Sequence, residues 1–316
     1  MAGAQPTTAR SRQARLACAL ERTGTGSLLR RLGAWRGLLV LTYHRIGDAS
    51  SSPLDRSLFS ASAGAFERHV AHLARETEVI EVDEVPSALR ARRGRRVLIT
   101  FDDGYRDAYD VAFPILRGAG LPAVFFLATG YLDRPRLSWW DELAWMGAGP
   151  ADVVAYKRLG PRDAEEFLDR AAARSGRGRA PAGAADGVWM TWDMAREMRD
   201  AGMAFGGHTV DHPVLARLDA DQQEQQIRGC AARLAAELGT AMRTFSYPVG
   251  SPDAFDAGTR RLVGEAGCDV AFTLAGGRVR PGAADPLALP RMTVGEWLSV
   301  DQVKAATALP QVFARW

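Results

Sequence analysis

Apolar runs of strand length recur along the chain and alternate with segments of helical periodicity. Runs such as VLITF at 97–101 and AVFFL at 123–127 are almost continuously apolar, which is typical of strands buried on both faces of a parallel sheet. Glycines such as Gly120 and Gly239 follow several helical segments, at the position where a helix often ends in a left-handed residue. The pattern predicts strands at 38–43, 79–82, 97–101, 123–127, 203–206, 244–247 and 270–274. It predicts helices around 66–73, 108–116, 194–198, 227–238 and 262–266.

Strands that alternate with helices through short connections indicate an α/β fold built from parallel βα units. Seven or so such units closing on themselves would form a (β/α) barrel, complete or distorted. An open doubly wound sheet is the alternative. The glycine-rich motifs that hold phosphates in nucleotide-binding sheets do not follow the early strands.

One insertion interrupts this repeat at about 131–190. It begins near LSWWDELAWM and ends in RSGRGRAPAGAADG, whose composition is typical of a flexible loop. Because strands resume at 203, we expect a single domain. The predicted divisions are a basic, partly flexible N-terminal segment at 1–37, the barrel with its insertion at 38–300, and a C-terminal tail at 301–316.

The composition is that of an ordinary soluble globular protein, with 47% hydrophobic and 24% charged residues. The net charge of +3 comes from arginine, because Lys157 and Lys304 are the only lysines. We attribute this bias to a GC-rich coding sequence and expect no nucleic-acid partner. The first 45 residues carry eight arginines against the single acid Glu21. A mobile or loosely docked tail is the favoured interpretation, and peripheral contact with anionic lipid is the alternative.

The cysteines and the apolar runs bear on the compartment. Cys18, Cys230 and Cys268 are far apart and lack CxxC spacing, so we predict neither a disulfide framework nor a thiolate zinc site. Cys230 and Cys268 are expected in the core. No run reaches the roughly 18 apolar residues of a membrane helix, and the run at 16–20 is shorter than the apolar region of a signal peptide. We therefore expect a cytoplasmic protein.

Polar side chains stand where the predicted strands end, which is where the chemistry of a parallel barrel collects. His44 ends the first run, Asp102 and Asp103 end VLITF, and His208 follows the run at 203–206. A late segment, LALP, ends in Arg291. His69 and His72, by contrast, lie in a helical pattern and are expected at the helix surface or its boundary.

Two imidazoles and one carboxylate with a position left for water form the usual catalytic zinc pattern. His208 and His212 are four residues apart, a spacing that lets both face one ion. A divalent cation would also offset the repulsion between Asp102 and Asp103, although one of these could instead cap the following helix. The unliganded aspartate would then be free to act as a base. His44 is a candidate general acid, or else a strand-end histidine bonded to the backbone.

Three motifs together resemble the NodB-type polysaccharide deacetylases, carbohydrate esterase family four: TFDDGYRD at 100–107, HTVDH at 208–212 and RTFSYPVGS at 243–251. LTYHRI at 41–46 and LPRMTV at 289–294 are similar to the branch with a YHxI strand, which includes poly-N-acetylglucosamine deacetylases. The resemblance spans residues 38 to 300. It implies a single-domain, distorted (β/α)7-type barrel that holds one divalent metal ion, most often zinc.

The resemblance also implies roles for individual residues. Asp103, His208 and His212 match the metal ligands, and Asp102 matches the catalytic base. A backbone N–H from the turn at 247–250 would stabilise the oxyanion.

The sequence departs from the family pattern in two places. Ser246 stands where an arginine usually pairs with the base, and the resemblance to this branch implies that Arg291 supplies that charge. No histidine follows His212, so His44 is the acid that the branch implies.

Several aromatic residues are candidates for substrate binding. Tyr105, Tyr247 and Pro248 flank the site in sequence and would bound the acetyl pocket. Trp140 would stack on a sugar ring or, as the favoured alternative, pack the insertion onto the barrel.

The sequence as a whole predicts a metal-dependent hydrolase that removes N-acetyl groups from amino sugars of a polysaccharide or its lipid-linked precursor. An O-acetyl esterase, a sugar deformylase and a catalytically inactive glycan-binding relative are the alternatives.

Overall fold

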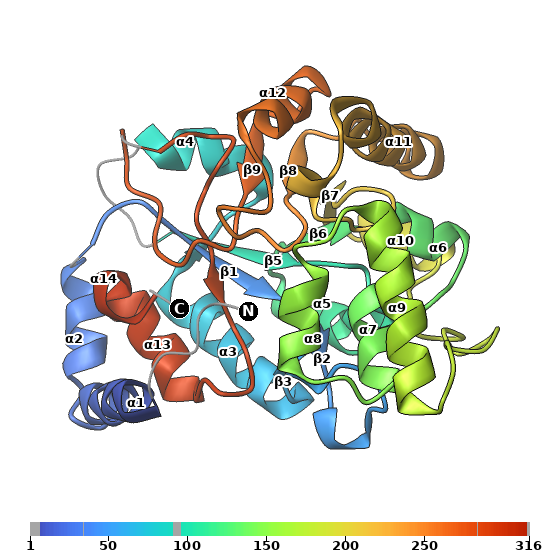
Figure 1. Cartoon of the computed structure of the whole chain (residues 1–316). Helices are drawn as coiled ribbons and strands as arrows, with labels where there is room; N and C mark the ends of the chain where they lie inside the picture. The colour runs from blue at the N-terminus through green and yellow to red at the C-terminus, as the bar shows by residue number, and fades with distance from the viewer. Residues whose placement is uncertain (1–6, 34, 91–95, 283, 315–316) are drawn as a thin grey trace.

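The computed structural model describes residues 7–33, 35–90, 96–282 and 284–314. Its centre is a curled parallel sheet with helices around it (Figure 1). The strand order is β10-β1-β5-β6-β7-β8-β9, and β4 pairs with β5 at its start. The strands are β1 (Leu38–Tyr43), β4 (Glu78–Val79), β5 (Arg96–Phe101), β6 (Val124–Leu127), β7 (Ala204–Gly207), β8 (Thr244–Ser246), β9 (Val270–Phe272) and β10 (Met292–Thr293). Two short strands, β2 (Arg45–Ile46) and β3 (Phe59–Ala61), form a separate pair.

All seven predicted strands are present, so the parallel α/β prediction is confirmed. The segment before β10 decides between a barrel and an open sheet. Leu289 pairs in parallel with Phe272 of β9, and Met292 then pairs with Leu41 of β1. This segment joins the two edges of the curled sheet, and the architecture is therefore the distorted barrel rather than the open doubly wound sheet.

Successive side chains of each strand point to opposite faces of the sheet, so the strand residues divide between two apolar layers. Leu39, Ile99 and Phe125 belong to the large cluster under the outer helices, whereas Leu98 and Phe126 belong to a second cluster inside the curl. The outer helices are α3 (Ala63–Glu76), α5 (Phe113–Ala119), α6 (Thr129–Asp133), α10 (Trp192–Asp200), α11 (Ala220–Leu238) and α12 (Ala257–Glu265). Helix α4 (Val85–Arg90) packs against the second cluster through Val85 and Ala88.

The insertion folds as a separate layer beside the barrel (Figure 1). It consists of α7 (Trp139–Trp145), α8 (Pro150–Tyr156) and α9 (Pro161–Ser175). These helices have an apolar cluster of their own, centred on Trp139, Leu143 and Leu168. The chain returns to the barrel where Trp189 bridges to Tyr105. The insertion is therefore anchored directly next to the Asp102–Asp103 pair.

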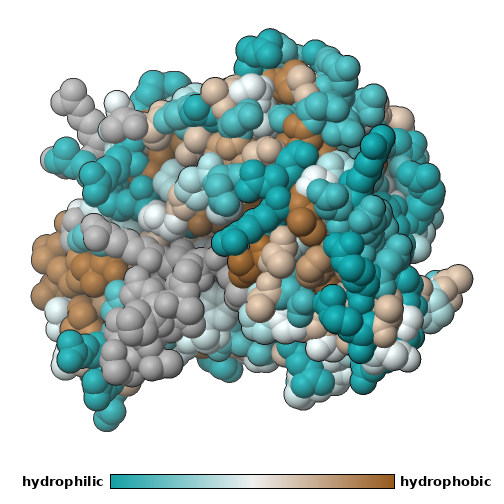
Figure 2. Space-filling model, viewed as in Figure 1, coloured by the Kyte–Doolittle hydropathy of each residue, from teal (hydrophilic) through white to brown (hydrophobic). Residues whose placement is uncertain are grey.

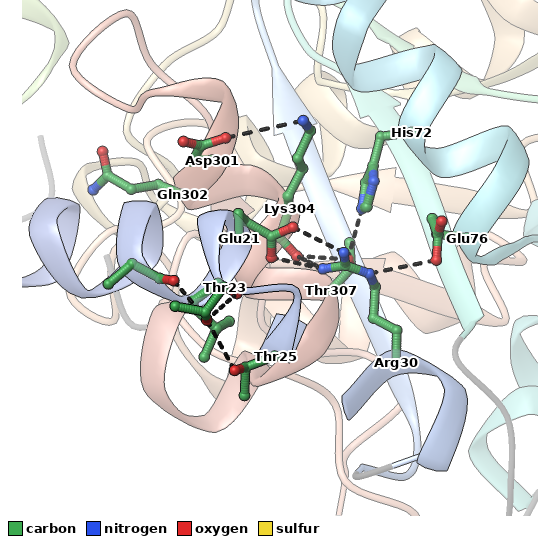
Figure 3. A network of polar contacts seen from close by, with 12 residues as sticks. Glu21, Thr23, Thr25, Arg30, His72, Glu76, Asp301, Gln302, Lys304 and Thr307 are labelled. Carbon is green, nitrogen blue, oxygen red and sulfur yellow. Dashed lines mark hydrogen bonds and ion pairs between the residues drawn. The ribbon is translucent and has the colours of Figure 1, made fainter. Parts of the chain in front are cut away.

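The N-terminal residues do not form the loosely docked tail that the sequence favoured. Residues 7–32 form α1 (Thr7–Arg22) and α2 (Thr25–Leu32), which pack with α13 (Val300–Ala308), α14 (Pro310–Phe313) and α3 (Figure 1). The physical reason is a buried ion pair that local sequence does not show. The guanidinium of Arg30 bonds both carboxylate oxygens of Glu21 at 2.8 Å and lies 3.5 Å from Glu76 (Figure 3). Residues 1–6 and 315–316 of the predicted terminal segments lie outside the described residues.

The expected surface positions of His69 and His72 are wrong. Both imidazoles are buried, because α13 covers this side of α3. His72 Nε2 lies 2.9 Å from the hydroxyl of Thr307 on α13, and His69 Nδ1 lies 3.4 Å from that of Tyr43. Burial lowers the pKa of His69 to about 4 and that of His72 to about 3, with the nearby cations Arg30 and Lys304 adding to the effect on His72.

We expect these histidines to make the fold acid-sensitive. In the unfolded chain they take up protons below about pH 6.5, whereas in the native state they stay neutral to about pH 4 and pH 3. Stability is therefore full above pH 6.5 and falls as the pH falls below it. His72→Gln should reduce the loss of unfolding free energy between pH 6.5 and pH 4 by roughly 2–3 kcal/mol. Urea unfolding of both proteins at the two pH values measures this, and an unchanged difference would contradict it.

All three thiols are free in the described chain, and Cys230 and Cys268 are buried in the core as predicted. Within the same residues, no helix combines the length and the apolar character that crossing a bilayer requires.

Candidate active site

Two aspartates follow β5 at the C-terminal end of the barrel, and both carboxylates are buried. The Asp102 N–H donates to the carbonyl of Tyr43 at 3.0 Å, which continues the pairing between β1 and β5. Asp103 turns away with a φ of 76°. The two side chains consequently belong to different hydrogen-bonding groups, which separates two neighbouring like charges.

Asp103, His208 and His212 form a buried group whose candidate ligand atoms all lie within 4.8 Å of one another. The Nε2 atoms of His208 and His212 lie 3.4 Å and 3.5 Å from the same carboxylate oxygen of Asp103. The rings of the two histidines are edge to face, with centroids 4.6 Å apart. The spacing observed in the sequence therefore does bring three side chains of metal-ligating type to one point.

A hydrogen bond fixes how His208 presents its ring. Its Nδ1 lies 2.7 Å from the carbonyl oxygen of Ser246, which can only accept, so Nδ1 carries the proton. The lone pair of the neutral ring is then on Nε2, facing Asp103 and His212. Such a partner for the outer nitrogen is the usual way in which proteins orient a metal-binding imidazole.

Two glycines before His208 allow β7 to lie close to its neighbours. A Cβ at Gly206 would come within 2.6 Å of the ring of Phe126, and one at Gly207 within 2.2 Å of the sulfur of Met242. A side chain at either position would force these neighbours to move. The GGH sequence thus places His208 at the end of a strand that is pressed between β6 and β8.

Asp102 is held by Arg291, which is fully buried. The guanidinium donates to both oxygens of the carboxylate, at 2.8 Å and 2.7 Å, and also to the hydroxyl of Ser246 at 2.8 Å. That hydroxyl in turn donates to Asp102 at 3.1 Å. Burial alone would raise the pKa of Asp102, but Arg291 and the nearby His208 hold it well below its usual range. The carboxylate is therefore ionised throughout the neutral range.

We expect Arg291→Met to destabilise the fold by roughly 3–5 kcal/mol, because it leaves the Asp102 carboxylate buried without a counter-ion. Thermal or urea unfolding measures the loss. The double variant Asp102→Asn, Arg291→Met removes both charges and should recover part of the stability. A double variant no more stable than Arg291→Met would contradict the ion-pair explanation.

The remaining predicted residues occupy different positions around this centre. His44 is half-buried, its backbone N–H donates to the hydroxyl of Ser60, and it lies close enough to lower the pKa of both aspartates. Pro248 is buried in the turn after β8. The hydroxyl of Tyr247 donates to the carbonyl of Leu287.

The turn at 247–250 limits where an oxyanion donor could come from. The Tyr247 N–H is used by the carbonyl of Phe272, and proline has no N–H. The donor that the family resemblance places here would therefore be Val249 or Gly250.

Trp140 is only 5% exposed. Its ring therefore packs the insertion onto the barrel and leaves no free face on which a sugar ring could stack. Its ring contacts His212 edge to face, with centroids 4.4 Å apart, and its Nε1–H donates to the hydroxyl of Tyr105 at 2.7 Å. That hydroxyl donates to Asp141 at 2.6 Å. The insertion therefore supports one of the metal-ligand candidates and also fixes Tyr105.

Asp141 and Thr100 are site residues that the sequence reasoning missed. Burial raises the pKa of Asp141 to about 6, although Tyr105, Ser138 and the Asp55 N–H all donate to it. Thr100 accepts a bond from Arg291 at 3.2 Å. For Asp141, the only signal in the sequence is that a charged residue stands inside the aromatic segment WWDE. For Thr100, which lies within the apolar strand VLITF, the sequence contains no such signal.

The backbone around the site is strained. In the described chain, the residues other than glycine with a positive φ are Asp103, Thr209, His212 and Val249. All four follow the C-terminal ends of β5, β7 or β8. Such conformations cost on the order of 1–3 kcal/mol each and concentrate at functional sites. The His212 N–H bonds the hydroxyl of Thr209 at 2.9 Å, which helps to hold the loop.

Comparison with known proteins identifies one matching sequence family and several solved structures with a similar fold. The sequence model of a family described as polysaccharide deacetylase matches residues 90–271. Among curated protein sequences, none matches significantly. The deacetylase PplD of Streptococcus pyogenes, solved in complex with acetate, superposes with a TM-score of 0.61 at 19% identity, over 88% of this chain and 98% of that chain.

Two other solved structures have the same fold. IcaB from Ammonifex degensii gives a TM-score of 0.60 at 24% identity, over 88% of this chain and 98% of its own. A de-N-acetylase from Aggregatibacter actinomycetemcomitans gives 0.56 at 18% identity, over 83% of this chain and 96% of its own.

Proposed function

Because this chain belongs to the polysaccharide deacetylase family, we propose that it is a metal-dependent hydrolase that removes N-acetyl groups from amino sugars of a glycan. The observation that carries the proposal is the buried group of Asp103, His208 and His212 next to the ion pair of Asp102 and Arg291. One group can hold a cation, and the other presents an ionised carboxylate. Metal-assisted hydrolysis needs both.

The residues present fit a divalent cation, most simply zinc. One carboxylate and two imidazoles are the donors that catalytic zinc sites use, with a fourth position left for water. The Nδ1 bond of His208 to Ser246 leaves Nε2 facing the other two donors. A cation held there would polarise the acyl oxygen and lower the pKa of a water molecule.

Asp102 is the proposed base. Its carboxylate takes a proton from the attacking water, while Arg291 and Ser246 keep it oriented. The low pKa that Arg291 imposes makes Asp102 a weak base but guarantees that it is ionised. His44 is the proposed acid that protonates the leaving amine, since it lies beside both aspartates and a protonated imidazole can donate a proton.

Glycan N-acetyl groups are the proposed substrate, in a polysaccharide or its lipid-linked precursor. The names of two structural relatives, a deacetylase and a de-N-acetylase, support this choice. O-acetyl ester and N-formyl groups present the same small acyl carbonyl and remain the competing substrates. The cytoplasmic location predicted from the sequence stays a prediction, which fractionation of cells that express the full chain would test.

The release of acid from defined sugars tests the proposal. The zinc-loaded protein is incubated with N-acetylglucosamine oligomers, O-acetylated oligosaccharides and N-formylglucosamine, and acetate and formate are quantified. We expect acetate from the N-acetyl oligomers and little from the esters. Faster release of acetate from the O-acetylated sugars, or of formate from N-formylglucosamine, would assign a different substrate. If no acid is released from any of the three sugars, the hydrolase proposal is wrong.

A further inference from the structure

The helices α1 and α2 present leucines to solvent. Leu16 is 51% exposed, Leu28 56% and Leu32 71%. Leu28 and Leu32 are four residues apart on α2 and so lie on one face of that helix. Figure 2 shows the corresponding hydrophobic patch at the left edge of the molecule, where Figure 1 places α2.

Exposed arginines lie on the same two helices and directly after them. Arg12, Arg15 and Arg22 lie on the exposed side of α1, Arg31 lies between the two leucines of α2, and Arg36 follows. None of the five forms an ion pair with any described residue. The only acid in the first 45 residues, Glu21, is already bonded to Arg30. The surface is therefore both apolar and uniformly positive.

The two helices are held firmly on the body, so this surface is preformed. Figure 3 shows Arg30 of α2 bonded to Glu21 of α1 and paired with Glu76 of α3. Arg30 also donates to the carbonyl of Lys304 on α13 at 3.2 Å. The hydroxyl of Thr23 bonds the carbonyl of Ala19 and the hydroxyl of Thr25, which fixes the turn between the helices.

We propose that the outward face of α1 and α2 binds the surface of an anionic lipid bilayer. Leucine side chains enter the boundary between headgroups and acyl chains, and arginines on the same helices pair with anionic headgroups. A second copy of this chain is the less suitable occupant, because it would bring two positive faces together without an acid to pair them. The proposal does not depend on the hydrolase activity.

Vesicle binding by the full-length protein tests the proposal. Sedimentation with vesicles of phosphatidylcholine alone is compared with sedimentation with phosphatidylcholine and phosphatidylglycerol, at low and at high salt. We expect binding to the anionic vesicles only, weakened by salt. The variant Arg12→Gln, Arg15→Gln, Arg31→Gln should bind about a hundredfold more weakly. Leu28→Ser, Leu32→Ser should also bind about a hundredfold more weakly.

Matched controls lie on the insertion, away from α1 and α2 (Figure 1). Val154 is 42% exposed on α8, and Arg158, Arg162 and Arg170 are exposed. Val154→Ser and the triple glutamine variant of these arginines should bind vesicles like the parent. Unchanged unfolding temperatures show that the variants are folded.

Two results would overturn the proposal. One is equal sedimentation of the parent and the α1–α2 variants with anionic vesicles. The other is an absence of vesicle binding together with self-association that Leu28→Ser, Leu32→Ser abolishes, which would assign the face to a second copy.

Discussion

Asp102→Asn is expected to lower the rate of acetate release from N-acetylglucosamine oligomers by about 10²–10⁴-fold, the contribution that a positioned base makes. The amide has the shape of the carboxylate but cannot take the proton of the attacking water. Its KM should change little, because Asp102 is held inside the protein by Arg291 and Ser246. Steady-state kinetics on the zinc-loaded proteins measures both constants.

Loss of folding must be separated from loss of the base. Asp102→Asn leaves Arg291 buried without its counter-ion, so unfolding should be measured on the same samples. The matched control is Asp107→Asn. Asp107 is half-buried and accepts a bond from Arg45 at 2.8 Å, but it belongs to neither group of the site. We expect the control to keep its turnover within about tenfold of the parent. A similar turnover for Asp102→Asn at normal metal content would remove Asp102 as the base.

His208→Ala is expected to abolish stable metal binding and, with it, acetate release. It removes one of three candidate ligands. Loss of an outer partner of a ligand alone typically costs 10–100-fold in metal affinity, and loss of the ligand itself should cost more than about 100-fold. The zinc content after dialysis should fall from one equivalent to near zero. Elemental analysis and competition with a chromophoric chelator measure it.

The control for this prediction is His72→Gln, which alters a buried histidine far from the candidate ligands in sequence and on the outer side of α3. It should retain one equivalent of zinc. Chelation of the parent should remove the activity, and added zinc should restore it. Full zinc content in His208→Ala would show that the metal is held elsewhere.

Local patterns were sufficient for the strands and for the chemistry at their ends. A strand buried on both faces must be apolar throughout. The runs VLITF and AVFFL therefore identified β5 and β6 without tertiary information. In a parallel sheet the polar residues that follow such strands meet at one edge. Asp103, His208 and His212 could therefore be predicted to converge, and they do.

Long-range contacts were beyond those patterns. His69 and His72 have the spacing of a helix surface, and only the packing of α13 from the far end of the chain buries them. The basic N-terminus looked like a tail because its attachment is an ion pair of Arg30 with Glu21 and Glu76, which no periodicity reveals. Trp140 was placed near the site, but its contact with His212 depends on how the insertion folds back.

The sequence by itself determined the parallel α/β core and the residue types available for hydrolysis, because burial and strand direction act on each segment separately. Only the tertiary structure decided which of these groups touch. Arg291 lies 189 positions beyond Asp102, and closing of the barrel by the segment before β10 brings its guanidinium to 2.7 Å from that carboxylate. Contacts between distant segments depend on the whole path of the chain, and no single segment encodes them.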